Sequence, residues 1–182
     1  MAEEAERFTA LYDACRQHVW AYAVSRAGRQ VADEVVSETF VIAWRRFADI
    51  PEPPLPWLLG VARNALRDSA RAQARREALT AEVQGWNESP EEDFADEVAD
   101  RNLILRALAS LGEGDREALV LTAWHGLHAH EAAKVVGCSA TTMRVRLHRA
   151  RKRLAQALDL DRQAPPVATF VPVAVKAVGE EA

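Results

Sequence analysis

Hydrophobic residues in the first part of the chain recur every three to four positions, which is the spacing of one apolar face on a helix. We expect a first helix whose stripe is Phe8, Leu11, Tyr12, Cys15, Val19 and Tyr22. Gly28 should close this helix, and a second should run from about Ala32 to Phe47. The predicted core stripe of the second helix is Val36, Phe40, Ala43, Trp44 and Phe47.

A proline-rich run separates the second helix from a third. Prolines within Ile50–Pro56 remove backbone donors and push the residues before them toward extended geometry, so we expect a stiff, non-helical loop. From Trp57 the pattern becomes helical again, with an apolar side formed by Leu58, Val61, Ala62, Ala65 and Ser69. Arg63, Arg67 and Arg71 lie about 140° to 180° from the centre of that side. The third helix therefore has a core face and an arginine face.

An acidic segment divides the chain. Residues 82–100 contain eight Asp or Glu and no Lys or Arg, with Gly and Pro interrupting any period. This composition is typical of a solvated linker. Beyond it we expect helices over Leu103–Leu111 and Arg116–Trp124, a turn at Gly126 and a short helix through Val136. Residues 137–139 then turn the chain into a last helix, with Ser139 as N-cap, which is a helix-turn-helix pattern.

The last helix is strongly basic outside its predicted core stripe of Met143, Leu147, Ala150 and Leu154. The remaining arc carries Arg144, Arg146, His148, Arg149, Arg151 and Arg153, and no acid occurs between positions 140 and 153. A helix of this kind fits the major groove of DNA, where arginines contact guanine edges and phosphates. The competing interpretation is a solvated basic helix on a bundle, but such a face would normally mix charges of both signs.

Composition agrees with a helical protein that has two small units. The chain has 182 residues, of which 49% are hydrophobic and 27% charged, and it contains few alternating β-type runs. We predict an all-α fold with a unit over residues 7–76, a linker over 77–100, a helix-turn-helix unit over 101–158 and a disordered tail over 159–182. The acidic N-terminus and the absence of a long apolar segment favour a cytoplasmic protein without membrane insertion.

Neither cysteine suggests a disulfide or a catalytic site. Cys15 and Cys138 lie far apart in sequence, and Cys15 falls on a core stripe although His18 is one turn away. His125, His128, His130 and Cys138 could supply zinc ligands, but their spacing matches no standard finger. We therefore predict no catalytic residue, no metal and no cofactor.

Two groups of residues carry a resemblance to a known family. In the first unit these are the run from Asp33 to Phe40 with Trp44, followed by Trp57, Arg63, Asn64, Arg67 and Arg71. In the second it is the run from Thr142 to Arg151. In this order, with a short acidic segment between them, they resemble regions two and four of the extracytoplasmic-function (ECF) sigma factors. The sequence departs from the usual family pattern at Ser37, Gly112, Ala132 and Val145.

The resemblance implies an alternative sigma factor that binds core RNA polymerase and directs promoter recognition, DNA melting and transcription initiation. Polymerase would be bound by Asp33, Val36, Ser37, Glu38 and Phe40, although Val36 or Phe40 could instead be wholly core. The minus-ten element would be bound by Trp57, Arg63, Asn64, Arg67 and Arg71. The minus-thirty-five element would be bound by Thr142, Arg144, Arg146, His148, Arg149 and Arg151.

Two other classes of function remain open at this point. A polymerase-independent regulator would bind a palindromic operator as a dimer through the helix-turn-helix. An interaction module such as an anti-sigma factor would bind polymerase or a sigma factor without reading DNA. The family also commonly has an anti-sigma partner, and the sequence leaves open whether this chain has one.

Overall fold

The computed structural model describes residues 2–81 and 99–163, and within these ranges every regular element is helical. The all-α prediction is therefore confirmed for the described part of the chain. Most of the predicted linker (82–98) and most of the predicted tail (164–182) lie outside the described residues. We refer to residues 2–81 as the N-terminal unit and to residues 99–163 as the C-terminal unit.

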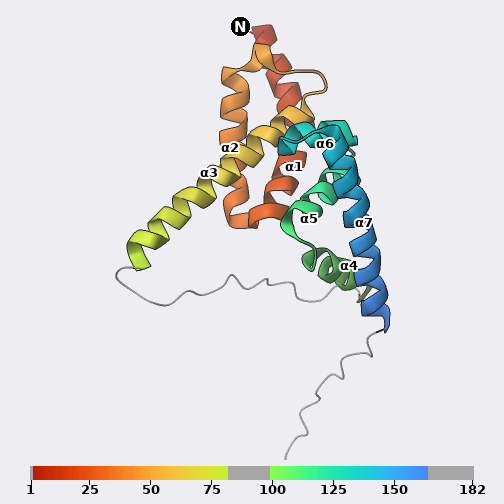
Figure 1. Cartoon of the computed structure of the whole chain (residues 1–182). Coiled ribbons are helices and arrows are strands. Elements are labelled where there is room, and N and C mark those ends of the chain that lie inside the picture. The colour runs from red at the N-terminus through yellow and green to blue at the C-terminus, as the bar shows by residue number, and fades with distance from the viewer. Residues whose placement is uncertain (1, 82–98, 164–182) are drawn as a thin grey trace, which may run out of the picture.

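The N-terminal unit is a bundle of three long helices (Figure 1). α1 (Ala2–Ala27) and α2 (Arg29–Arg45) meet at Gly28, whose φ of 77° lies in the left-handed region that favours glycine. A single 3₁₀ turn, η1 (Phe47–Asp49), follows α2 and precedes the proline-rich loop. Val19, Tyr22 and Leu58 are almost fully buried between the helices, as the apolar stripes predict. Val35, which lies outside the predicted stripe of the second helix, is buried as well.

Three details of this unit differ from the sequence-based expectation. α3 (Leu55–Ala81) begins two residues before Trp57, so Leu55 and Pro56 belong to the helix rather than to the loop. Proline is tolerated in a first helical turn, because the N–H group that it lacks would have no partner there. Trp44, predicted on the core stripe, is 50% exposed, and Phe47 lies outside α2 in the 3₁₀ turn.

The C-terminal unit consists of α4 (Ala99–Ala109), α5 (Glu113–Leu119), α6 (Ala129–Val136) and α7 (Ala140–Gln163). The helix predicted over Arg116–Trp124 is instead the short α5 continued by a π-helical turn, η2 (Val120–Trp124). α7 continues five residues past the predicted end at Leu158, so residues 159–163 are helical and not part of a disordered tail.

The helix-turn-helix forms as the sequence predicts. Gly137 ends α6 with a φ of 74°, and Ser139 caps α7 by accepting a hydrogen bond from the Thr142 N–H at 3.0 Å. Met143, Leu147 and Ala150 are buried, and Leu154 packs against the same core. α7 is therefore anchored by one apolar stripe, which leaves its basic residues on the other sides.

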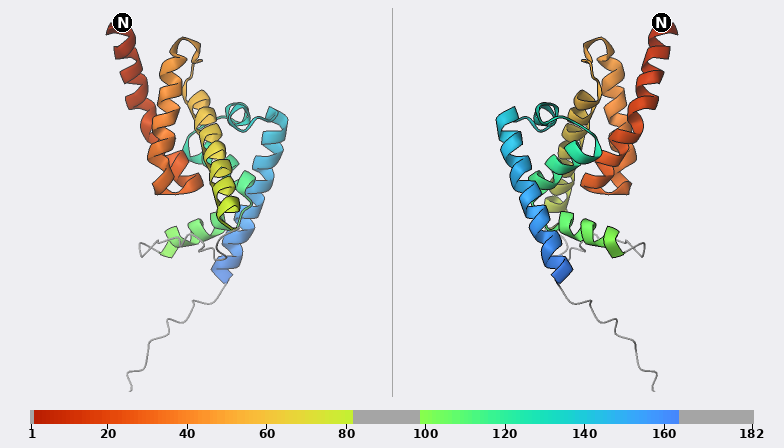
Figure 2. Two further views of the ribbon diagram at one scale, coloured as in Figure 1. Left: turned by 90° about the vertical axis from the view of Figure 1, so that its left-hand side faces the viewer. Right: turned by 90° about the vertical axis from the view of Figure 1, so that its right-hand side faces the viewer.

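The N-terminal and C-terminal units pack against each other. α3 crosses beside α6, and the ends of α1 and α5 also meet, as the side views show (Figure 2). The buried apolar residues of both units form one continuous cluster that runs from Cys15 to Ala150. We call this packing of the two units the closed arrangement. It has a shared apolar core, in addition to the polar contacts described below.

Candidate nucleic-acid interface

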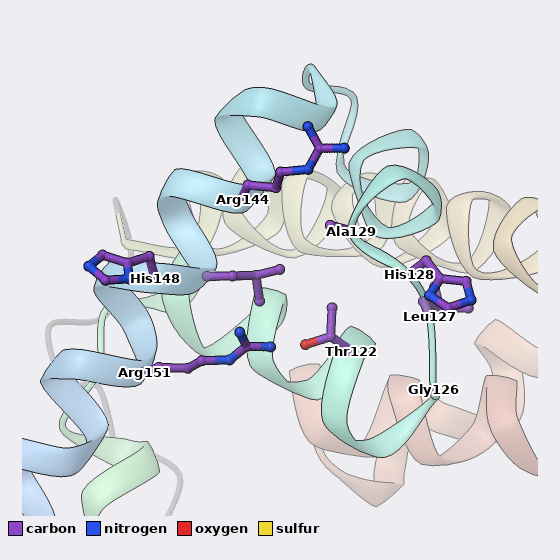
Figure 3. Close-up of a pocket in the computed structure, with 9 residues that line it drawn as sticks. Thr122, Gly126, Leu127, His128, Ala129, Arg144, His148 and Arg151 are labelled. Atoms are coloured by element: carbon purple, nitrogen blue, oxygen red, sulfur yellow. The ribbon is translucent and has the colours of Figure 1, made fainter.

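A hollow of about 390 Å³ lies between α7 and the turn that leads into α6. Arg144, His148 and Arg151 border it from α7, at positions i, i+4 and i+7, which share one helix face. Thr122 and His128 border it from the other side (Figure 3). Arg144, His148 and Arg151 are all exposed. We call these three side chains and the space beside them the basic hollow.

The other cations of α7 lie in different surroundings. Arg146 is half-buried beside Gly114 of α5, and Arg153 forms an ion pair with Asp115, which is also on α5. Arg149 and Thr142 are exposed, and the Thr142 hydroxyl lies 2.8 Å from the Ser139 hydroxyl within the cap. The predicted minus-thirty-five residues therefore divide into an exposed group and Arg146, which faces the body of its own unit.

The arginine face of α3 is also divided. Asn64, Arg67 and Arg71 are exposed, and Arg71 forms an ion pair with Asp68 at 3.3 Å. Arg63, by contrast, is covered by the C-terminal unit, where its Nε donates to Glu117 Oε1 at 2.9 Å. Trp57 is half-buried, and the Arg46 guanidinium lies 5.9 Å from its ring centre.

Glu117 is the centre of a polar network between the units. Its side chain is almost fully buried and accepts hydrogen bonds from Arg63 and from the Tyr22 hydroxyl, the latter at 2.6 Å. Burial alone would raise the pKa of Glu117, but these hydrogen bonds and the nearby arginine charges lower it overall. Burial and the neighbouring carboxylate raise the pKa of Tyr22. At neutral pH the site therefore holds a carboxylate and a neutral phenol.

Two histidines meet in the same contact. His125, directly after η2, is 6% exposed, and its Nδ1 lies 3.4 Å from the Nδ1 of His18 on α1. Burial, together with the charge of His18, lowers the pKa of His125 to about 4. Within the described residues, no three His, Cys, Asp or Glu side chains are grouped as metal ligands would be.

A second hollow, of about 570 Å³, lies between α1 and α2 and is mostly apolar. Val36 and Phe40 are buried at its base, while Val41 and Trp44 are about half exposed at its rim. Phe8 on α1 packs edge-on against Trp44, with ring centres 4.9 Å apart. We call this site the apolar hollow.

The polar residues predicted to bind polymerase lie beside the apolar hollow on α2. Asp33, Ser37 and Glu38 are all exposed. Asp33 accepts a hydrogen bond from the Trp20 indole at 3.1 Å, and Ser37 donates one to the Asp33 backbone carbonyl. Val36 and Phe40 thus belong to the core and also form the base of an open surface. The exposed pair at the rim, Val41 and Trp44, was not among the predicted residues.

Comparison with known proteins identifies the family. Residues 11–76 match the family model of Sigma-70 region 2, and residues 101–154 match that of Sigma-70, region 4. The RNA polymerase sigma factor CnrH of Cupriavidus metallidurans is 36% identical over 141 residues, which are 71% of this chain and 74% of CnrH. The chain belongs to the ECF sigma factors. It is an alternative sigma factor that directs transcription initiation.

A second relative and one solved structure agree with this assignment, and a further solved structure shares the fold. The ECF sigma factor SigL of Mycobacterium tuberculosis is 33% identical over 160 residues, covering 84% of this chain and 89% of SigL. CnrH in complex with the cytosolic domain of CnrY has a TM-score of 0.58 at 29% identity, covering 86% of this chain and 90% of that one. The sigma factor RpoE of Bartonella quintana, solved with the anti-sigma factor NepR, shares the fold. Its TM-score is 0.67 at 24% identity, covering 86% of this chain and 99% of RpoE.

Among the described residues, no helix is both long enough and apolar enough to cross a bilayer.

Proposed function

We propose that this sigma factor divides promoter recognition between two separate cationic surfaces and docks on core polymerase through the apolar hollow. The observation that carries this proposal is the placement of the exposed basic residues. One group lies on α3 of the N-terminal unit and the other on α7 of the C-terminal unit. Because the basic residues are divided between two units, tight promoter binding would require polymerase to hold both units in register.

The basic hollow and the neighbouring exposed residues of α7 would bind the minus-thirty-five duplex. Arg144, His148 and Arg151 line one side of the helix, and Arg149 and Thr142 are exposed near them. In helix-turn-helix proteins the second helix enters the major groove, where such side chains contact base edges and phosphates. Arg146 faces α5 and would contribute less than its sequence position suggests.

The exposed part of the arginine face of α3 would bind the melted strand at the minus-ten element. Arg67 and Arg71 would contact phosphates, while Asn64 and Trp57 would lie near the unpaired bases. Arg63 would join this surface only when it is released from Glu117. In this proposal the chain binds and melts DNA but supplies no catalytic group, and it works in the cytoplasm.

Polymerase would dock on the apolar hollow and on the acidic residues beside it. Trp44 and Val41 offer exposed apolar area, and Asp33 and Glu38 add charge at the border. Exposed tryptophans surrounded by polar residues often contribute strongly to protein interfaces. CnrH and RpoE were each solved with a partner protein, and we propose that this chain, too, has an anti-sigma partner.

The test is run-off transcription from genomic fragments with purified core polymerase, with and without this protein. New discrete start sites that appear only with the protein support the proposal and locate both promoter elements. Replacing Arg144 and Arg149 by alanine should abolish these transcripts while leaving polymerase binding intact. Transcripts that survive this change would contradict the proposed role of α7. A DNA footprint by the free chain that is as strong as that of the holoenzyme would favour a polymerase-independent regulator.

A further inference from the structure

The contact between the two units is built from side chains that are distant in sequence. Each hydrogen bond that the Glu117 carboxylate accepts within the described residues comes from the N-terminal unit, from Tyr22 or Arg63. An ion pair between Arg26 and Glu113 adds a second charged contact nearby. A carboxylate that is 3% exposed is stable only while such partners remain in place. The closed arrangement is therefore specific rather than a loose collision of two domains.

Closure withholds one residue of the proposed minus-ten surface. The Arg63 guanidinium uses both Nε and Nη2 on Glu117, at 2.9 and 3.5 Å. A phosphate group would be bound through the same donors. Glu117 and nucleic acid therefore compete for Arg63, and the units must separate before α3 can use its whole arginine face.

The histidine pair makes this contact sensitive to protons. His125 is 6% exposed, and its Nε2 is buried without a hydrogen-bond partner among the described residues. Its neighbour across the contact is His18, whose ring nitrogen lies 3.4 Å away, and the Tyr22 ring lies 6.0 Å away. A proton on His125 would bury a positive charge next to a group that is itself able to become positive.

The other charged groups around His125 would not neutralise that charge. Arg26 on α1 and Arg63 on α3 are themselves cations. The acids of α5 are engaged, since Glu117 accepts from Arg63 and Tyr22, and Glu113 pairs with Arg26. On α6 and in the residue before it, Glu131 accepts from the His128 N–H, and the rings of His128 and His130 stack on each other.

We propose that the contact between the units is an acid-labile latch, in which Glu117 holds Arg63 away from nucleic acid and protonation of the His18–His125 pair releases it. The effect on promoter binding rests on the function proposed above. The separation of the two units in acid does not. Because the pKa of His125 is about 4 in the closed form and near 6.5 once exposed, the open form binds more protons. The latch is then fully effective above pH 6.5 and weakens as the pH falls toward 4. The ratio of open to closed chain should rise about tenfold between pH 7.5 and 5.5.

Small-angle X-ray scattering of the full chain, without polymerase or DNA, measures this opening directly. We expect the radius of gyration to rise reversibly between pH 7.5 and 5.5, with unchanged helix content by circular dichroism. The series should be repeated with Tyr22→Phe, which loses the 2.6 Å hydrogen bond to Glu117 and so starts from a larger open fraction. His125→Gln should remove most of the pH response, and His130→Gln, which changes an exposed histidine of α6, should retain it.

Three results would overturn the latch. One is a radius of gyration that stays constant with pH in both the original chain and the Tyr22→Phe variant. Another is expansion accompanied by loss of helix content, because acid would then be unfolding the chain. The third is an equal response from the His125→Gln and His130→Gln variants. If His125→Gln does not fold, His18→Gln replaces it, because His18 is exposed and its loss should reduce the acid response.

Transcription assays separate the latch from the proposed function. If the chain opens with acid but gives no promoter-specific transcripts with core polymerase, the latch stands and the proposed function fails. If the chain supports transcription yet never opens with acid, the latch fails alone. If both hold, Glu117→Gln should raise single-stranded minus-ten DNA binding by the free chain at pH 7.5 by several-fold, and an additional Arg63→Gln change should cancel that gain.

Discussion

Replacing Arg144 and Arg151 by alanine should reduce the salt dependence of promoter binding by the holoenzyme. Both side chains are exposed on the same face of α7 and border the basic hollow. Each phosphate that a protein neutralises adds about 0.9 to the slope of log affinity against log salt concentration. Two lost contacts should therefore lower the slope by about 1.8. Over a fourfold rise in salt, the original chain should lose about twelvefold more affinity than the double variant.

The assay is fluorescence anisotropy of a labelled promoter fragment with reconstituted holoenzyme, titrated at several potassium chloride concentrations. Arg151→Ala should lower the slope by about 0.9, whereas Arg153→Ala should leave it nearly unchanged. The two arginines lie two positions apart and carry the same charge, but Arg153 is paired with Asp115 of α5. Thermal melts should show that both variants are folded. Equal slope changes for the two would mean that net charge, and not the basic hollow, governs binding, which would refute the geometric argument.

Three further predictions concern the cap, the apolar hollow and the core. Ser139→Ala should destabilise the chain by about 1 kcal/mol, because the 3.0 Å cap to the Thr142 N–H is lost, whereas Ser139→Asp should retain most of the stability; thermal or urea denaturation measures both. Trp44→Ala should weaken binding to core polymerase at least tenfold, about 1.4 kcal/mol, in a competition assay with a labelled sigma factor, with little effect on helix content. Leu58→Ala, at a fully buried position, should cost about 2 to 5 kcal/mol of unfolding free energy in urea titration, and a smaller loss would mean that this core is loosely packed.

The local elements were largely predictable because their signals are local. A three-to-four-residue apolar period is enough to place Met143, Leu147 and Ala150 in the core, and glycine at position 28 is enough to end the first helix. The Ser139 cap follows in the same way from its place before a helical pattern. These features depend on residues within a few positions of one another, so tertiary context did not alter them.

The errors occur where distant segments meet. Arg63 lies opposite the core stripe of α3, which predicts that it faces solvent. The C-terminal unit covers that side, however, and no local sequence pattern indicates where that unit lies. Trp44 fits the apolar period of α2 and contacts Phe8 of α1, yet half of the residue remains exposed. His125 and His18 are 107 positions apart, so their meeting was equally invisible to periodicity.

For the candidate site, the sequence gives the residue types but not the surroundings of each side chain. The sequence indicates which side chains are basic, but it does not distinguish Arg146 and Arg153, which face α5, from Arg144 and Arg151, which border an open hollow. That distinction depends on which sides of α7 its neighbours cover. The exposed rim of the apolar hollow was missed for the same reason.

The π-helical turn η2 suggests how the histidine contact could be gained or lost in evolution. In this turn the His125 N–H bonds the Val120 carbonyl at 3.2 Å, five residues back, where an ordinary helix would use four. One residue fewer here would restore a regular helix and turn the following side chain by about 100° around the axis. A chain with a regular helix at this place should not bring a histidine against α1, even when the surrounding residues are the same. If the proposed latch holds, the length of this short stretch, more than its composition, decides whether a histidine reaches α1.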